Sequence, residues 1–95
     1  MRRGPMEDME LPIIVADTPW RRLRGLLGHR EPPPFALRLE RCRCVHTFGM
    51  RFALDLHWLD ADGAPLRIDR AVPPGRVRAC RGARAIVEVP CRSRH

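Results

Sequence analysis

Ten prolines and seven glycines divide this chain into apolar runs that are too short for long helices. Most of these runs alternate between two faces with a period of two residues, which is typical of β-strands. The sequence therefore predicts a mainly β fold, specifically a compact β-sandwich or jelly-roll-like single domain with one short α-helix. The predicted strands are 11–16, 35–39, 45–47, 52–59, 64–72, 77–80 and 83–89.

A chain of 95 residues has room for one hydrophobic core, because two cores would leave each half too short to bury its apolar surface. We expect a flexible tail at 1–10, a single β-rich domain at 11–90 and a frayed C-terminus at 91–95. The longest uninterrupted apolar stretch, Ile13–Ala16, is far shorter than a membrane span or a signal-peptide core. We therefore expect a monomer without a membrane span, located in the cytoplasm.

The helical pattern lies at about residues 19–28. Asp17 or Thr18 is suited to cap free backbone N–H groups, and Pro19 has the backbone geometry of a first helical turn. Gly28 is suited to end the helix in a left-handed conformation. An apolar stripe at helical spacing is formed by Trp20, Leu23 and Leu27.

The strand patterns also suggest how the strands are arranged. Residues 52–59 are largely apolar on both faces, which predicts a central strand. Asp60–Gly63 has the composition of a hairpin turn. The alternation slips at Glu40–Arg43, which predicts a bulge or loop there. A turn after 77–80 predicts that this strand pairs with 83–89 as a closing hairpin.

The chain is strongly basic, with a net charge of +7, and all 18 of its basic residues are arginine. Arginine without lysine, in a chain rich in alanine, proline and glycine, is typical of GC-rich coding and needs no ligand to explain it. Two basic blocks, 18–51 and 73–95, leave arginine-mediated nucleic-acid binding as an alternative. The sequence argues against it, because the aromatic interleaving of single-strand binders is missing.

The four cysteines contain no CxxC pair and are interpreted as unpaired thiols. Two alternatives stay open. Cys42 or Cys44 forms a disulfide under oxidation, or the spacing Cys42-x-Cys44-x-His46 provides zinc ligands that Cys80 completes. The predicted loop at 40–43 weakens the zinc alternative, because the three ligands share a face only on a regular strand. We assign no metal and no cofactor.

Four separated motifs, which follow Thr18 in this order, resemble those of a known family. They are Arg24–Leu27, His46–Asp55, Leu59–Gly63 and Gly82–Glu88. Over about Leu11–Pro90 the chain is similar to domain of unknown function 192, a family of uncharacterised small prokaryotic proteins. The resemblance implies a compact β-sandwich or jelly-roll-like fold with one short helix, and no established activity.

The chain departs from the commonest form of that family. Many relatives carry Trp-Met-Lys-Asn-Thr where this chain has His46–Met50, and proline where it has Ala53. The form found here is similar to that of high-GC actinobacterial relatives, some of which are encoded near pilus and secretion genes. The resemblance therefore implies a bacterial protein with a role accessory to a secretion or pilus system.

Candidate site residues cluster around His46, Thr47, Asp55 and His57. Asp55 and His57 are two residues apart on one strand, so they leave the same face roughly 6 to 7 Å apart. A carboxylate beside an imidazole fixes its tautomer and raises its pKa, as in a general base or a metal ligand with its supporting residue. We favour a structural alternative, in which Asp55 accepts N–H bonds from the turn at 48–51, because no nucleophile is placed beside an imidazole.

Three functional hypotheses follow from these patterns. The first is a non-enzymatic module that binds a partner protein or small ligand. The second is a metal-binding protein or hydrolase-like enzyme that uses His46, Asp55 and His57. The third is nucleic-acid binding by the arginine blocks. Under the first hypothesis no residue is catalytic, and the binding residues are His46, Thr47, Phe48, Met50, Arg51 and Asp55.

Overall fold

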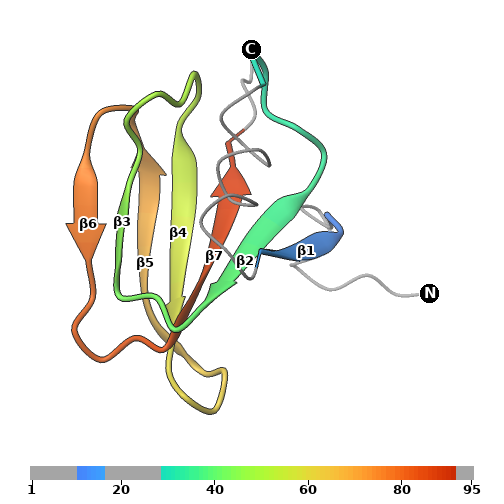
Figure 1. Ribbon diagram of the computed structural model, residues 1–95. Helices are drawn as coiled ribbons and strands as arrows, with labels where there is room; N and C mark the ends of the chain where they lie inside the picture. Colours follow the sequence, from blue (N-terminus) through green and yellow to red (C-terminus); the bar gives the residue numbers. More distant parts are fainter. Residues whose placement is uncertain (1–10, 17–28, 92–95) are drawn as a thin grey trace.

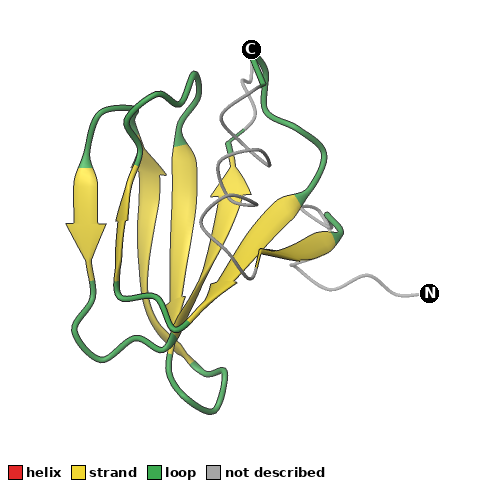
Figure 2. Ribbon diagram, in the orientation of Figure 1, coloured by secondary structure: helices red, strands yellow, loops and turns green. Residues whose placement is uncertain are grey.

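The computed structural model describes residues 11–16 and 29–91. These residues form seven strands in two sheets (Figures 1 and 2). The strands are β1 (Ile13–Ala16), β2 (Ala36–Glu40), β3 (Cys44–His46), β4 (Leu54–Leu59), β5 (Pro65–Val72), β6 (Val77–Ala79) and β7 (Ala85–Pro90). The predicted mainly β class is confirmed. The predicted helix at 19–28, the tail at 1–10 and residues 92–95 lie outside the described residues.

The larger sheet has five strands in the order β1-β2-β7-β4-β5, and the smaller sheet pairs β3 with β6. The β1 strand runs parallel to β2 at the edge of the larger sheet, and Pro12 directly precedes it, as is typical of proline beside an edge strand. The β4 strand lies between β7 and β5, so the predicted central position of this strand is confirmed. All other strand pairs are antiparallel.

The hydrophobic core lies between the two sheets. Alternate residues of β4 point into it, and Trp58 is completely buried among them. Val45 of β3 belongs to the same core cluster, which shows that β3 packs against the inner face of β4. The other buried members of the cluster are Leu37, Met50, Phe52, Leu54, Leu56, Val72, Ala83 and Ile86. Each strand therefore has an inner and an outer face, and polar groups on the outer faces lie on opposite sides of the sandwich.

The β4–β5 hairpin follows the predicted turn. The Asp60 side chain accepts hydrogen bonds from the backbone N–H groups of Asp62 and Ala64, at 2.8 and 2.9 Å. Gly63 adopts a φ of 83°, in the left-handed region that glycine enters without a steric penalty. The predicted irregularity at Glu40–Arg43 is also confirmed, because β2 ends at Glu40 and β3 begins only at Cys44.

The predicted closing hairpin between 77–80 and 83–89 is wrong. The β6 strand pairs with β3, whereas β7 inserts between β2 and β4. The turn at Cys80–Ala83 is closed by an N–H···O bond of 3.1 Å and carries the chain from one sheet to the other. The physical reason is burial, because β7 has buried side chains on both faces, with Ile86 and Glu88 on one and Ala85 on the other, and an interior position in the larger sheet provides this cover.

Candidate functional site

Asp55 lies on the outer face of β4, opposite the core, with a side chain that is 18% exposed. Its Oδ1 accepts the backbone N–H of Ala71 at 2.7 Å. Between the pairs Leu54–Val72 and Leu56–Asp69, the single residue Asp55 of β4 faces two residues of β5, Arg70 and Ala71, so β5 contains a bulge. Ala71 lies in this bulge with a φ of 49°, an uncommon conformation for a residue with a side chain.

The Asp55 carboxylate therefore stabilises a strained bulge in the neighbouring strand. We expected it to bind the turn at 48–51, and this partner is wrong, because the backbone bond of its side chain goes to Ala71 instead. The expected structural role as an acceptor of a backbone N–H is retained. Arg70 lies 3.8 Å from the other carboxylate oxygen, but its side chain is largely exposed, so this ion pair contributes little.

Cys91 is the third group at this carboxylate. Its Sγ donates to Asp55 Oδ1 at 3.4 Å. Burial raises the pKa of the Cys91 thiol to about 11, with a further contribution from the negative charge and hydrogen bond of Asp55. A thiol with this pKa is protonated near neutral pH, so Cys91 is not an activated nucleophile.

His57 is the remaining polar group on this side of β4. Burial lowers its pKa, and the charge of Arg70 lowers it further, while the charge of Asp55 acts in the opposite direction. Within the described part of the chain, its buried Nε2 has no hydrogen-bond partner. Burial thus favours the neutral form of the His57 imidazole.

His46 does not join Asp55 and His57. It lies on the outer face of β3, whereas Val45 beside it points into the core. Because β3 and β4 pack through their inner faces, His46 and the Asp55–His57 pair point to opposite sides of the sandwich. The fold therefore does not assemble the three-residue centre on which the enzyme hypothesis depends.

The alternative zinc ligands do not converge either. Cys44 and His46 are exposed, whereas Cys42 and Cys80 are half-buried against the core. Among the residues that the structure describes, no group of three His, Cys, Asp or Glu side chains is arranged to hold a metal ion. No disulfide joins any of the four cysteines, all of which lie in the described ranges.

Thr47 is buried and connects two loops. Its Oγ1 donates to the carbonyl of Pro73 at 2.7 Å and accepts the N–H of Arg76 at 2.8 Å. Its backbone carbonyl accepts N–H groups from Met50 and Gly75, at 3.2 and 3.0 Å. Thr47 was expected to bind a ligand, but its hydroxyl is committed to the 73–76 loop.

The turn after Thr47 separates an exposed aromatic residue from the core. Gly49 has a φ of 84°, which makes a tight turn in which Phe48 points outward and Met50 is buried. Phe48 is 54% exposed, and its ring centroid lies 5.5 Å from that of His46. Arg51, which follows the turn, is also exposed. Of the expected binding residues, Phe48 and Arg51 are exposed on this side, together with His46, whose Nδ1 accepts the Phe48 N–H at 3.2 Å.

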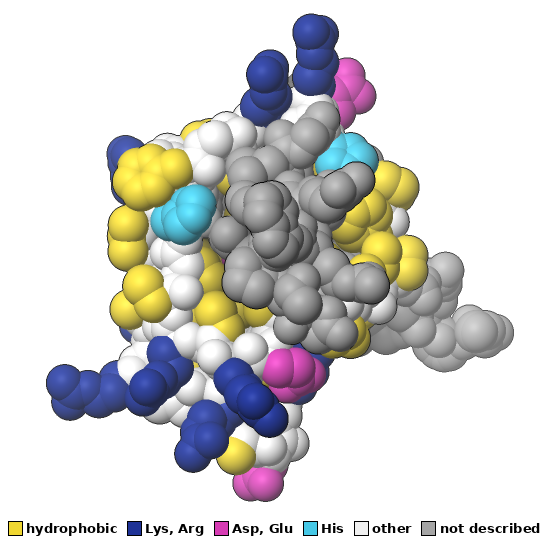
Figure 3. All heavy atoms as spheres, viewed as in Figure 1, with side chains coloured by type: hydrophobic (Ala, Val, Ile, Leu, Met, Phe, Trp, Pro, Cys, Tyr) yellow, Lys and Arg dark blue, Asp and Glu magenta, His cyan; other side chains and the backbone are white. Residues whose placement is uncertain are grey.

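The two-stranded sheet presents an exposed surface around these residues. In its register Cys44 lies opposite Ala79 and His46 opposite Val77, so all four side chains share the outer face. Val77 is 53% exposed. We call these four residues together with Phe48 the β3–β6 face. Figure 3 shows hydrophobic side chains and one histidine together over β3 and β6.

The backbone edge of β6 is closed by arginine side chains. Arg67 of β5 donates to the carbonyl of Ala79 at 2.6 Å, and Arg78 donates to that of Val77 at 2.9 Å. Arg67 also bonds Asp69, which accepts the Trp58 indole N–H at 3.0 Å. Because the outward carbonyls of β6 are occupied, the edge is protected against the addition of another strand.

These features of the fold agree with the comparison with known proteins. The family model of domain of unknown function 192 (DUF192), described as "Uncharacterized ACR", matches residues 3–93. The chain belongs to the DUF192 family. No curated protein matches it. A crystal structure of a protein of unknown function from Novosphingobium aromaticivorans DSM 12444 is similar, with a TM-score of 0.71 and 16% identity, over 84% of this chain and 63% of that chain. This similarity shows the fold alone, and the DUF192 chain spans less than two thirds of that protein.

The sequence analysis missed Val77 and Ala79 of the β3–β6 face in this DUF192 protein, because it paired their strand with β7. The available signal was strand length. The run at 77–79 has three residues, so it cannot pair along all six residues of 85–90. No helix in the described part of the DUF192 chain has the length and apolar character to cross a membrane.

Proposed function

We propose that this DUF192 protein is a non-enzymatic binding module that engages a partner protein or small ligand through the β3–β6 face. The main support for this proposal is that Phe48 and Val77 are each more than half exposed on a surface that strand pairing holds in place. Exposed apolar groups that gather on one face are typical of interaction sites. Arg51 lies at the end of this face and contributes a positive charge.

The face is preorganised, which supports recognition over catalysis. The hydrogen bonds of Thr47 hold the His46–Met50 turn against the 73–76 loop. Ordering costs on binding are therefore small. With the β6 edge closed, the partner contacts side chains and does not extend the sheet. A component of a secretion or pilus system is the partner class that the family resemblance implies.

The proposal is tested by titrating the ¹⁵N-labelled protein with a library of small aromatic fragments and following amide shifts by NMR. We expect shifts at Cys44–Phe48 and Val77–Ala79. The variant Phe48→Ser should abolish them, whereas Ile68→Ser, an equally apolar change on the exposed strand β5, should not. Shifts that instead surround Asp55 and His57 would refute the proposal and favour the hydrolase-like alternative.

A further inference from the structure

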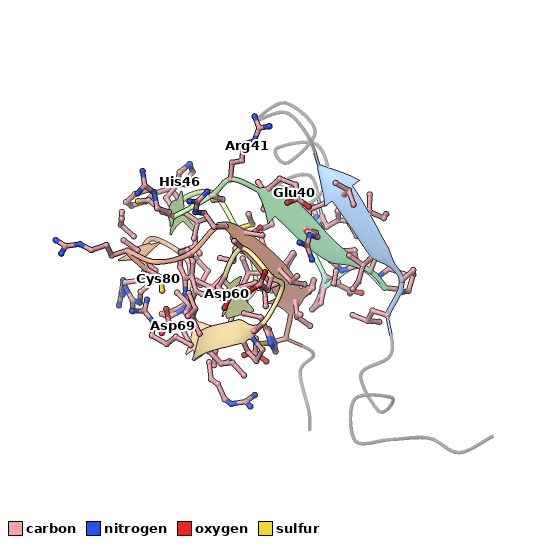
Figure 4. The ribbon with its side chains drawn as sticks, turned by 90° about the horizontal axis from the view of Figure 1, so that it is seen from below. Glu40, Arg41, His46, Asp60, Asp69 and Cys80 are labelled. Atoms are coloured by element: carbon pink, nitrogen blue, oxygen red, sulfur yellow. The ribbon has the colours of Figure 1, made fainter. Side chains whose placement is uncertain are left out.

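Four exposed arginines gather at one end of the β3–β6 face. They come from two loops, and we call Arg41, Arg43, Arg81 and Arg84 together the arginine end. The N–H of Arg41 donates to the carbonyl of Arg84 at 2.6 Å, and the N–H of Cys80 donates to that of Arg43 at 2.9 Å. These two bonds hold the 41–43 and 81–84 loops side by side. Figure 3 shows the group of arginine side chains below the β3–β6 face, and Figure 4 shows Arg41 extending from this end.

The positive charge of the arginine end is not neutralised within the described residues. The ion pairs among these residues join Arg38 to Glu40, Arg67 to Asp69 and Arg70 to Asp55. The nearby acids Glu40 and Asp60 are engaged, because Glu40 binds Arg38 and Asp60 accepts the amides of its own turn. Four like charges held together without counter-charges favour an anionic occupant.

The arginine end continues directly into the exposed aromatic pair. The two-stranded β3–β6 ribbon extends from the Arg43–Cys80 backbone hydrogen bond to the Thr47–Arg76 backbone hydrogen bond. This length is four residue steps, or roughly 14 Å. His46 and Phe48 lie at the far end, and Arg76 and Arg51 are exposed beyond them. Small side chains, Cys44 and Ala79, lie between. A ligand that follows this path meets positive charge, then a flat aromatic surface, then positive charge again.

We propose that the β3–β6 face and the arginine end together bind single-stranded nucleic acid. The phosphates contact Arg41, Arg43, Arg81 and Arg84, and a base stacks on the Phe48 ring beside His46. The objection from sequence was that the aromatic interleaving of single-strand binders is missing. The fold supplies one stacking position, because β3 and β6 bring the aromatic pair and the arginines onto one ribbon. This inference rests on the proposed binding role of the β3–β6 face and assigns it nucleic acid in place of a partner protein or small ligand.

An acidic peptide would satisfy the arginines equally well, but the exposed ring favours a base. Every base has a π-face that stacks on an aromatic side chain, and such stacking tolerates any sequence. On the β6 edge, arginine side chains already bond the carbonyls of Val77 and Ala79, which would otherwise accept hydrogen bonds from an added peptide strand. The preference is therefore for a chain that carries both phosphates and planar bases.

The test is fluorescence anisotropy of a labelled oligothymidylate of about 12 nucleotides, a length within the range of known single-strand sites. Four phosphate contacts predict that log K falls with log salt with a slope of about −2.8, at roughly 0.7 per contact. The double variant Arg43→Gln/Arg81→Gln should reduce the magnitude of this slope by about 1.4. The control Arg38→Gln/Arg70→Gln removes the same charge from the other side of the sandwich and should leave the slope unchanged.

Stacking is tested separately with Phe48→Ala and Phe48→Leu. Both should weaken binding by roughly 5- to 150-fold, because leucine keeps an apolar side chain but has no π-face. Equal binding of the wild type and Phe48→Leu would overturn the stacking contact. Binding of a polyglutamate peptide or of polyphosphate, at matched charge, as tight as that of the oligonucleotide would overturn nucleic-acid recognition.

The outcomes separate this inference from the proposed function. If aromatic fragments shift the β3–β6 amides but the oligonucleotide does not bind, the ligand assignment fails and the binding role stands. If neither binds, both fail. A salt slope near zero would also overturn the inference, because phosphate contacts release counterions.

Discussion

Replacing Asp55 with alanine tests whether this carboxylate is structural. In the wild type, Oδ1 accepts the Ala71 N–H at 2.7 Å and the Cys91 thiol at 3.4 Å. A hydrogen bond to a charged group contributes about 1.5 to 3 kcal/mol, and the weak thiol donor adds little. The exposed pair with Arg70 adds almost nothing. We therefore expect Asp55→Ala to lower the free energy of unfolding by about 1.5 to 3 kcal/mol.

The assay is urea denaturation followed by tryptophan fluorescence, which reports on the buried Trp58. Asp55→Asn retains an oxygen acceptor but loses the charge, so it should cost about 1 kcal/mol. Asp62→Ala is the control, because this exposed turn residue bonds Asp60 through its backbone N–H and not through its side chain. Surface changes of this kind usually stay within about 0.5 kcal/mol. If Asp55→Ala costs no more than Asp62→Ala, the reasoning that assigns Asp55 to the β5 bulge is wrong.

Three further predictions concern other buried groups. Thr47→Val should lower the free energy of unfolding in urea by about 2 to 4 kcal/mol, because it leaves the Pro73 carbonyl and the Arg76 N–H unsatisfied, whereas Thr47→Ser should recover most of this loss. Because the pKa of His57 in the folded protein is lowered from 6.5, the unfolded chain binds more protons as the pH falls below that value. Stability measured across this range should therefore rise with pH, and a wild-type slope equal to that of His57→Gln would contradict the prediction. The raised pKa of Cys91, about 11, predicts slow alkylation by iodoacetamide at about pH 8, so mass spectrometry should detect the modification of exposed Cys44 first.

Much of the fold was predictable because its signals are local. The apolar residues on both faces of 52–59 predicted the central position of β4, and the composition of Asp60–Gly63 predicted the hairpin turn. The slip at Glu40–Arg43 predicted the break between β2 and β3. Each of these signals spans a few residues, and the backbone conformation that satisfies it does not depend on distant parts of the chain.

The candidate site was less predictable because it depends on which strands pair. His46, Asp55 and His57 are close in sequence, but the strands that carry them present them on opposite outer faces of the sandwich. The acceptor role of Asp55 followed from the cost of burying a carboxylate. The identity of its partner, Ala71, could not be predicted in this way, because the bulge in β5 is visible only once the register between β4 and β5 is known.

The sequence by itself determined the β-strands, the Asp60–Gly63 turn, the central position of β4 and membership of the DUF192 family. Only the tertiary structure decided that β6 pairs with β3 and not with β7, and that four arginines from two loops lie at the end of the ribbon that carries Phe48. The physical reason is that a turn and a face are set by neighbouring residues, whereas strand pairing is set by the apolar area that the whole chain buries. The exposed β3–β6 ribbon is what remains after β7, which has buried side chains on both faces, takes the position between β2 and β4.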